Sequence, residues 1–258
     1  MDDVAEKRVF EDRAGRTDLV VAGSVGVLDV AVAADRLGRF GIAHRCAPVD
    51  VAASAGSVAV ATEEDVLLRN ASAEVFESTG FGPAVAVAYD DAPVAAGPDG
   101  RIAAWRDGGW AEIGRIDTVV RAIDPPLLAA TDGVYRLPNL DYVGLDDAYD
   151  VAPAGPLAAT DEGLYSLGNG WMDELDGSFR VVATEAGRAH AATPDDLYER
   201  EAGTWSVASA PTDDPVVDVA YGDCPYAVTA DGSLLAHGAE GWRAHQLGVD
   251  GVVGCAVV

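Results

Sequence analysis

Residues 129–135 read Ala-Ala-Thr-Asp-Gly-Val-Tyr, and this phrase recurs along almost the whole chain of 258 residues. Close copies stand at residues 158–165 (Ala-Ala-Thr-Asp-Glu-Gly-Leu-Tyr) and 191–198 (Ala-Ala-Thr-Pro-Asp-Asp-Leu-Tyr). Looser copies have their turns at residues 26, 65, 100 and 232, so that successive copies lie 30 to 39 residues apart. Seven copies of one supersecondary unit indicate a repeat architecture.

Each unit is predicted to form four short strands. In the last complete unit, β-rich runs at residues 216–221, 226–229, 233–237 and 242–247 are separated by short turns that contain Gly, Asp or Pro. Turns of this kind between such runs are typical of β-hairpins. In four units a tryptophan opens the fourth run, where a large ring would cover the seam between neighbouring sheets: Trp110, Trp171, Trp205 and Trp242.

The two ends of the chain indicate that the repeats close into a ring. The first unit begins at the second-strand position with residues 18–23, and the chain ends with residues 252–258, a first strand with nothing after it. A stacked β-solenoid is the alternative, but a ring that takes its missing strand from the tail leaves fewer strand edges open to aggregation. We therefore predict an all-β, seven-bladed β-propeller with four-stranded blades, closed by pairing of the C-terminal strand into the first blade.

The whole chain, residues 1–258, is expected to be a single propeller domain. Residues 1–17 form an N-terminal extension whose place the sequence does not give. The expected blades comprise residues 18–48 plus 252–258, 49–83, 84–116, 117–147, 148–178, 179–214 and 215–251.

The charge balance is strongly acidic. The chain has 43 acidic and 17 basic residues, for a net charge of −26, and Lys7 is its only lysine. At about 1 M salt the Debye length is only ~3 Å, so repulsion between surface carboxylates is largely screened. The composition therefore predicts adaptation to multimolar salt; an acidic surface for cations or a basic partner is the alternative. Binding to nucleic acid is not expected, because phosphates require clustered Lys and Arg.

Cysteine usage and hydropathy predict a soluble cytoplasmic protein. Cys46, Cys224 and Cys255 are scattered and none lies in a C-x-x-C spacing, which does not fit a disulfide framework. The acidic N-terminus lacks the basic and apolar regions of a signal peptide. No apolar run approaches the roughly 20 residues that cross a membrane.

Parts of the sequence resemble two groups of known β-propellers. The repeated phrase, followed by Gly-Trp, resembles the short-blade propeller repeats of many sensor and sialidase-like proteins, which implies an architecture only. The segments at residues 6–10 (Glu-Lys-Arg-Val-Phe), 37–41 (Leu-Gly-Arg-Phe-Gly) and 43–46 (Ala-His-Arg-Cys) resemble a haloarchaeal β-propeller family of uncharacterised function. That resemblance implies a propeller and supplies no catalytic residues to carry over.

The candidate ligand-binding residues are Asp50, Asp150, Asp218 and Arg121. When the first strands are aligned, the three aspartates occupy one shared position. Because the first strand of a propeller blade lines the central channel, these carboxylates would share that channel. They would either hold a hydrated cation through oxygen ligands or accept hydrogen bonds from backbone N–H groups of an adjacent inner strand. Arg121 lies one position further along its strand and is the candidate cationic partner at the channel mouth.

Other chemistry has little support in the sequence. The turns between second and third strands gather Asp and Glu on one face, which is either a docking face for a basic partner or simply what tight turns require. The four histidines are scattered over three blades, no paired metal-ligand motif occurs, and no nucleophile signature or phosphate-binding Gly-Lys loop is present. We expect no catalytic residue, no metal and no cofactor.

The leading hypothesis is a non-catalytic interaction or scaffold propeller that binds a protein partner or a small ligand on one face. The alternative is an enzyme or ligand sensor with a pocket at the channel mouth, built from the aspartates and an arginine. A third hypothesis is a propeller whose face assembles a homo-oligomer. All three rest on the architecture, and fold alone does not determine function.

Overall fold

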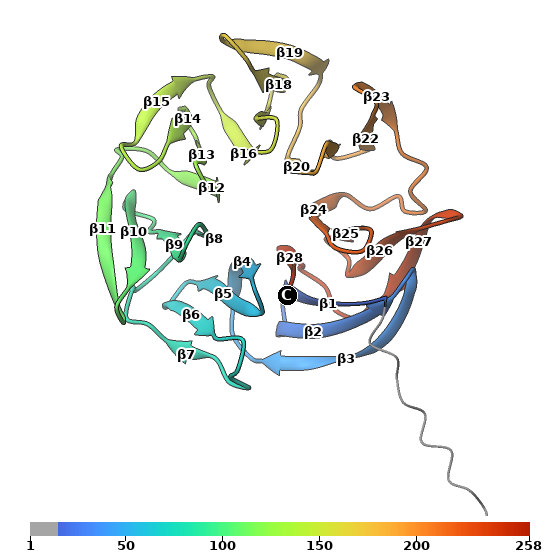
Figure 1. The fold of residues 1–258 in the computed structure, drawn as a ribbon, viewed down its shortest axis with the longest axis horizontal. Coiled ribbons are helices and arrows are strands. Elements are labelled where there is room, and N and C mark those ends of the chain that lie inside the picture. The colour runs from blue at the N-terminus through green and yellow to red at the C-terminus, as the bar shows by residue number, and fades with distance from the viewer. Residues whose placement is uncertain (1–14) are drawn as a thin grey trace, which may run out of the picture.

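Seven four-stranded antiparallel sheets are arranged around one axis (Figure 1). The computed structural model describes residues 15–258, and no helix occurs in this range. Residues 1–14, which hold most of the expected N-terminal extension and the segment 6–10, lie outside the described residues. The prediction of a seven-bladed propeller with four-stranded blades is confirmed.

Within each blade the first strand named lies next to the channel and the last lies at the rim (Figure 1). Blade 1 consists of β28 (Gly254–Val257), β1 (Arg16–Gly23), β2 (Gly26–Ala33) and β3 (Arg36–His44), and blade 2 consists of β4 (Pro48–Ser54), β5 (Ser57–Thr62), β6 (Val66–Arg69) and β7 (Glu77–Ser78). Blade 3 consists of β8 (Ala86–Tyr89), β9 (Pro93–Ala96), β10 (Arg101–Arg106) and β11 (Gly109–Arg115). Blade 4 consists of β12 (Val120–Asp124), β13 (Leu127–Ala130), β14 (Gly133–Arg136) and β15 (Asp141–Gly144). Blade 5 consists of β16 (Ala148–Ala152), β17 (Leu157–Thr160), β18 (Gly163–Leu167) and β19 (Trp171–Asp176). Blade 6 consists of β20 (Val181–Glu185), β21 (Arg188–Ala192), β22 (Leu197–Glu201) and β23 (Thr204–Val207). Blade 7 consists of β24 (Val216–Tyr221), β25 (Pro225–Thr229), β26 (Ser233–Gly238) and β27 (Gly241–Gln246).

The ring is closed by its last strand. β28 pairs antiparallel with β1, with Leu19 opposite Val257 and Val21 opposite Cys255. Blade 1 therefore takes its inner strand from the end of the chain and its other three strands from the beginning. The predicted closure is confirmed.

The recurring phrase is explained by the turn between second and third strands. The hydroxyl of Thr160 accepts hydrogen bonds from the backbone N–H groups of Glu162 and Gly163 and donates one to the Gly163 carbonyl. Gly133 and Gly232 occupy the turn with positive φ, and a Cβ on Gly232 would stand 1.9 Å from the carbonyl oxygen of Val249. The threonine hydroxyl thus closes the turn, and where the next connection passes closely the turn needs a glycine.

Small apolar residues fill the space between the blades. Among residues 15–258, seven buried clusters occur, one at each junction between neighbouring blades. The whole of β13, Leu-Leu-Ala-Ala, is buried because both faces of the strand are covered. The richness in Ala and Val follows from this geometry, since closely spaced sheets leave little room for larger side chains.

Three tryptophans of the outer strands, Trp110, Trp171 and Trp205, donate a hydrogen bond to the preceding blade. Nε1 of Trp171 donates a hydrogen bond of 2.8 Å to the Val143 carbonyl in blade 4. Nε1 of Trp205 donates to Glu174 in blade 5. Their indole side chains therefore hold neighbouring blades together and do not form an open surface.

Candidate functional site

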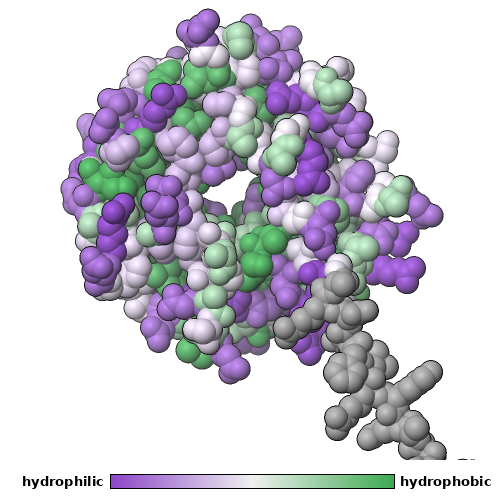
Figure 2. Space-filling view, in the orientation of Figure 1, coloured by the Kyte–Doolittle hydropathy of each residue, from purple (hydrophilic) through white to green (hydrophobic). Residues whose placement is uncertain are grey.

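The channel along the axis is open, as the space-filling view shows (Figure 2). It forms a cavity of about 470 Å³ whose wall includes Asp50, Asp150 and Asp218. The structure therefore brings these three aspartates into one channel. Asp124, at the end of β12, is a further carboxylate on the wall that the sequence alignment missed, because it lies past the aligned position.

Each of the three aspartates joins two blades by the same pair of hydrogen bonds. Oδ1 of Asp50 accepts from the N–H of Val51 in its own strand, and Oδ2 accepts from Val87 in blade 3, both at 2.8 Å. Asp150 in blade 5 reaches Val182 in blade 6 at 2.8 Å. Asp218 in blade 7 reaches Cys255 in blade 1 at 2.8 Å. We call these contacts the aspartate staples.

Burial in the channel wall changes the acidity of the staples. Desolvation raises the pKa of Asp50 to about 7; the charge of Asp218 adds to the rise, and the two N–H bonds oppose it. Desolvation also raises the pKa of Asp218 to about 6. The pKa of Asp150 is raised well above its usual value, again chiefly by desolvation. The charge of Asp218 also raises the pKa of both Asp50 and Asp150, and the charge of Asp124 adds to the rise at Asp150.

The staples use both oxygens of each carboxylate on backbone amides. Among residues 15–258, no group of three or more His, Cys, Asp or Glu side chains is arranged to hold a metal ion. The sequence leaves two arrangements open for these aspartates, cation binding and hydrogen bonding to backbone N–H groups. The structure shows the backbone hydrogen bonds at all three. Asp50, Asp150 and Asp218 thus accept backbone hydrogen bonds across seams between blades.

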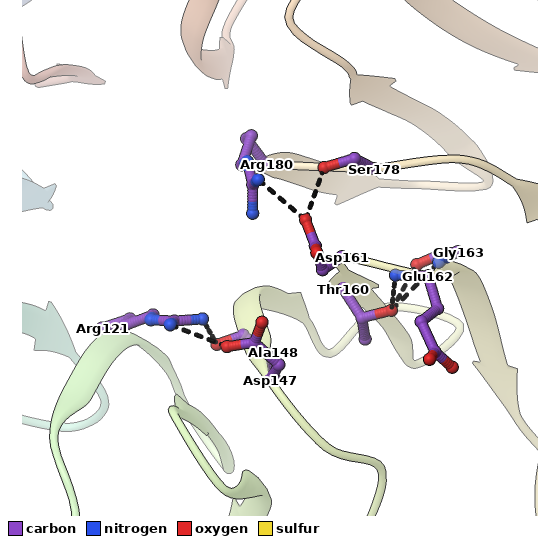
Figure 3. A network of polar contacts seen from close by, with 9 residues as sticks. All are labelled: Arg121, Asp147, Ala148, Thr160, Asp161, Glu162, Gly163, Ser178 and Arg180. Atoms are coloured by element: carbon purple, nitrogen blue, oxygen red, sulfur yellow. Dashed lines mark hydrogen bonds and ion pairs between the residues drawn. The ribbon is translucent and has the colours of Figure 1, made fainter.

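Arg121 lies outside the channel wall. It is the extra residue of a bulge in β12, where Val120 pairs with Ala130 and Ala122 pairs with Ala129. Its Nη2 forms an ion pair of 2.7 Å with Asp147, and its Nη1 donates to the Ala148 carbonyl (Figure 3). The bulge therefore turns Arg121 towards blade 5 and away from the aspartate staples.

Blade 5 is held from the other side by a second arginine. Arg180, just before β20 of blade 6, forms an ion pair of 2.8 Å with Asp161, which also accepts from the Ser178 hydroxyl (Figure 3). The Ser178 hydrogen bond and the Arg180 guanidinium hold the pKa of Asp161 below its usual value. The guanidinium carbons of Arg121 and Arg180 lie 3.9 and 3.6 Å from the centre of the Tyr149 ring. Both arginines are thus engaged between blades.

A groove lies between blades 1 and 2, where the rim of the ring is incomplete. β7 has two residues, whereas the other outer strands have four to nine. Beside it a cavity of about 550 Å³ opens between Gly41 and Ala43 on blade 1 and Gly56 and Ala71 on blade 2. We call this cavity the blade 1–2 groove.

A bidentate ion pair joins the two blades along the groove. Nη1 and Nη2 of Arg69 lie 2.9 and 2.8 Å from the carboxylate oxygens of Asp29. The Arg69 side chain is only 11 % exposed and lies over the Phe76 ring at 4.9 Å. The groove therefore has a fixed, charge-compensated wall.

The outer strand beside the groove is long and exposed. β3 has nine residues, and Phe40 and Ile42 are 40 % and 45 % exposed. Arg39 lines the groove and forms no ion pair with any residue in the described range, in contrast to Arg69. Sequence reasoning missed this site. The sequence signal was weak, because residues 70–83 lack the tryptophan that opens the fourth strand in four units, but the units at residues 18–48 and 117–147 lack it as well.

The solved structures that the chain resembles share its fold at low sequence identity. The computationally designed Ika8 protein matches with a TM-score of 0.63 and 14 % identity, over 93 % of this chain and 91 % of that chain. The WD40 β-propeller domain of Doa1 matches with a TM-score of 0.61 and 10 % identity, over 88 % of each chain. A chain of a Nidogen/Laminin complex matches with a TM-score of 0.61 and 11 % identity, over 93 % of this chain and 98 % of that chain. These likenesses show the fold alone.

No curated protein matches the sequence. No helix of the described residues has the length and hydropathy needed to cross a membrane. The sequence does match a protein family described as HVO_0234-like, beta propeller, over residues 3–258. This match spans nearly the entire chain and agrees with the resemblance carried by residues 37–41 and 43–46. The protein therefore belongs to the HVO_0234-like β-propeller family, which is named after a haloarchaeal protein.

Proposed function

We propose that this protein is a non-catalytic interaction module that docks a protein partner in the blade 1–2 groove. The observation that carries the proposal is the combination of a two-residue outer strand in blade 2 with the long, exposed outer strand of blade 1. Phe40 and Ile42 supply apolar contacts at the rim, and Gly41 and Ala43 leave room beside them. Exposed apolar side chains next to a groove are typical of protein-binding surfaces.

The enzyme or sensor hypothesis receives less support from the geometry. Its proposed residues, Asp50, Asp150, Asp218 and Arg121, are all engaged in contacts between blades. A general acid or base must reach a substrate within hydrogen-bond distance, and a carboxylate that already accepts two backbone N–H bonds is poorly placed for that role. We therefore assign these four residues to the cohesion of the ring.

Site-specific crosslinking tests the docking site. Gly41 is a suitable position for a photo-crosslinking amino acid, because a Cβ there meets no atom within 4 Å and its φ is not positive. Gly109, on the outer strand of blade 3, is equally open and serves as the matched control. We expect one protein to be captured from position 41 and not from position 109. Identical products from both positions, or none from position 41, would contradict the proposal.

The proposal includes adaptation to high salt and a cytoplasmic location. The net charge of −26 would oppose the compact state in dilute buffer, and the three cysteines are free thiols, which suit a reducing compartment. We expect the free energy of unfolding to rise as KCl is increased from about 0.1 M to about 2 M, because the Debye length shrinks from ~10 Å to a few Å. A free energy of unfolding that stays constant over this range would contradict the adaptation.

A further inference from the structure

We infer that the occupant of the blade 1–2 groove is an extended, acidic segment of a partner protein that pairs with β3 as an additional strand. This inference rests on the proposed function and adds the mode of binding and the chemistry of the partner.

The backbone of β3 offers one free edge. β3 pairs with β2 on one side, from Val27 opposite His44 to Ala33 opposite Arg36, and no strand of residues 15–258 pairs with its other side. A strand of nine residues is ~30 Å long, which is ample for a peptide that adds to a sheet edge. Main-chain N–H and C=O groups on that edge would supply affinity without regard to side chains.

The space beside β3 distinguishes it from the other outer strands. The groove is open next to Gly41 and Ala43, whose small side chains do not fill it, and its blade 2 wall comes from residues before the short β7, among them Ala71 and Glu74. Natural proteins usually protect long edges by covering them or by placing charge on them. β3 carries part of this protection, in Arg36, Arg39 and two register shifts in its pairing with β2, but it also presents Phe40 and Ile42 to solvent, which favours a partner that carries apolar side chains.

The charge of β3 selects the partner. Residues 36–46 contain Arg36, Arg39 and Arg45 and no acidic residue, on a protein with 43 acidic and 17 basic residues. None of the three arginines forms an ion pair with an acidic residue of the part of the chain that the structure describes. In high salt only ion pairs in direct contact persist, so alternating carboxylates on an added strand would meet these guanidinium groups at short range.

The probe for this inference is a fluorescently labelled peptide of alternating Asp and Val. Fluorescence anisotropy in about 2 M KCl measures its binding to the protein. Two control peptides have Lys in place of Asp, or N-methyl groups on alternate backbone amides. The protein variants are Arg39→Glu on β3 and Arg136→Glu on β14, which is exposed and forms no ion pair with a described residue. We expect the Asp–Val peptide to bind, about tenfold more weakly to Arg39→Glu, and unchanged to Arg136→Glu.

Each other outcome overturns the inference in a defined way. Equal binding of the N-methylated peptide would exclude strand addition, and equal binding of the Lys peptide would exclude the acidic specificity. If only the full-length Phe10→Asp variant binds the peptide, the chain's own residues 1–14 are the occupant. If the wild type self-associates and Phe40→Ala abolishes this, a second copy is the occupant. If neither the wild type nor any variant binds the peptide, but crosslinking from position 41 still captures a partner, the proposed function stands and the strand-addition mode is wrong.

Discussion

Oδ2 of Asp218 accepts a hydrogen bond of 2.8 Å from the backbone N–H of Cys255, so that a carboxylate of blade 7 holds the closing strand of blade 1. Its Oδ1 accepts from Val219 at 2.7 Å in its own strand. The junction between blade 7 and the closing strand therefore has a staple of the same kind as the junctions at Asp50 and Asp150. The propeller closes by strand pairing, and this carboxylate adds a side-chain bond across the seam.

Replacing Asp218 with alanine is expected to loosen the closing strand. The substitution leaves the N–H groups of Val219 and Cys255 without their acceptor, which costs about 1–3 kcal/mol of unfolding free energy. Denaturant unfolding measures the loss, and amide hydrogen exchange should show faster exchange at Cys255. Asp173→Ala, at an exposed position of β19, is the control and should change neither quantity. Unchanged exchange at Cys255 in Asp218→Ala would refute the staple.

The free energy of unfolding should fall as the pH rises from about 4 to about 7. In the unfolded chain Asp50 titrates near its ordinary pKa of about 3.9, whereas burial raises the pKa in the folded chain to about 7. Between these values the folded state binds more protons than the unfolded state, so raising the pH favours unfolding. Asp218, with a pKa of about 6 in the folded state, acts in the same direction.

Asp50→Asn tests this assignment, because an amide cannot titrate. Denaturant unfolding at fixed salt between pH 5 and pH 8 should show a shallower decline in the variant than in the wild type, since one of the shifted groups is gone. Parallel curves for the two proteins would show that Asp50 is not the source of the pH dependence.

The ring of Tyr149 should matter more than its hydroxyl. Arg121 and Arg180 stack on this ring from the two neighbouring blades. Each cation–π contact at a partly exposed site contributes roughly 0.5–1 kcal/mol, so Tyr149→Leu should lose about 1–2 kcal/mol of unfolding free energy. Tyr149→Phe keeps the ring and should stay within about 0.5 kcal/mol of the wild type. Equal losses in both variants, measured by thermal or chemical unfolding, would assign the effect to the hydroxyl.

The repeated turn should tolerate no side chain at Gly232. A Cβ there would stand 1.9 Å from the Val249 carbonyl oxygen, and the φ of +88° is strained for other residues. Gly232→Ala is expected to cost about 2 kcal/mol or more of unfolding free energy. Gly41→Ala, which meets no atom within 4 Å, should cost less than about 0.5 kcal/mol. Thermal melts of the two variants make the comparison, and equal melting temperatures would contradict this account of the phrase.

The sequence predicts the ring well because its evidence is periodic. Seven phrases fix the number of blades, and the unpaired run at residues 252–258 predicts the closing strand. Aligning the first strands also identifies Asp50, Asp150 and Asp218 as residues of one channel. Each of these inferences depends on position within a repeat, which a single sequence displays directly.

The contacts across blades could not be predicted in the same way. Whether Asp50 reaches the N–H of Val87 depends on the spacing of two inner strands, which the ring as a whole sets. Arg121 turns away from the channel because it is the extra residue of a bulge in β12, whereas in β4, β16 and β24 the channel aspartate comes directly after the corresponding bulge. The groove was missed because it arises from a missing element, the full-length fourth strand of blade 2.

We propose a docking groove at the rim and a structural channel at the axis. The most direct test is the dissociation constant of the partner captured at position 41, purified and measured against two variants in high salt. Gly41→Trp fills the groove and should weaken binding about tenfold or more, whereas Asp150→Asn alters only a staple and should stay within about twofold of the wild type. Loss of binding in Asp150→Asn together with unchanged binding in Gly41→Trp would contradict the account and place the functional site in the channel.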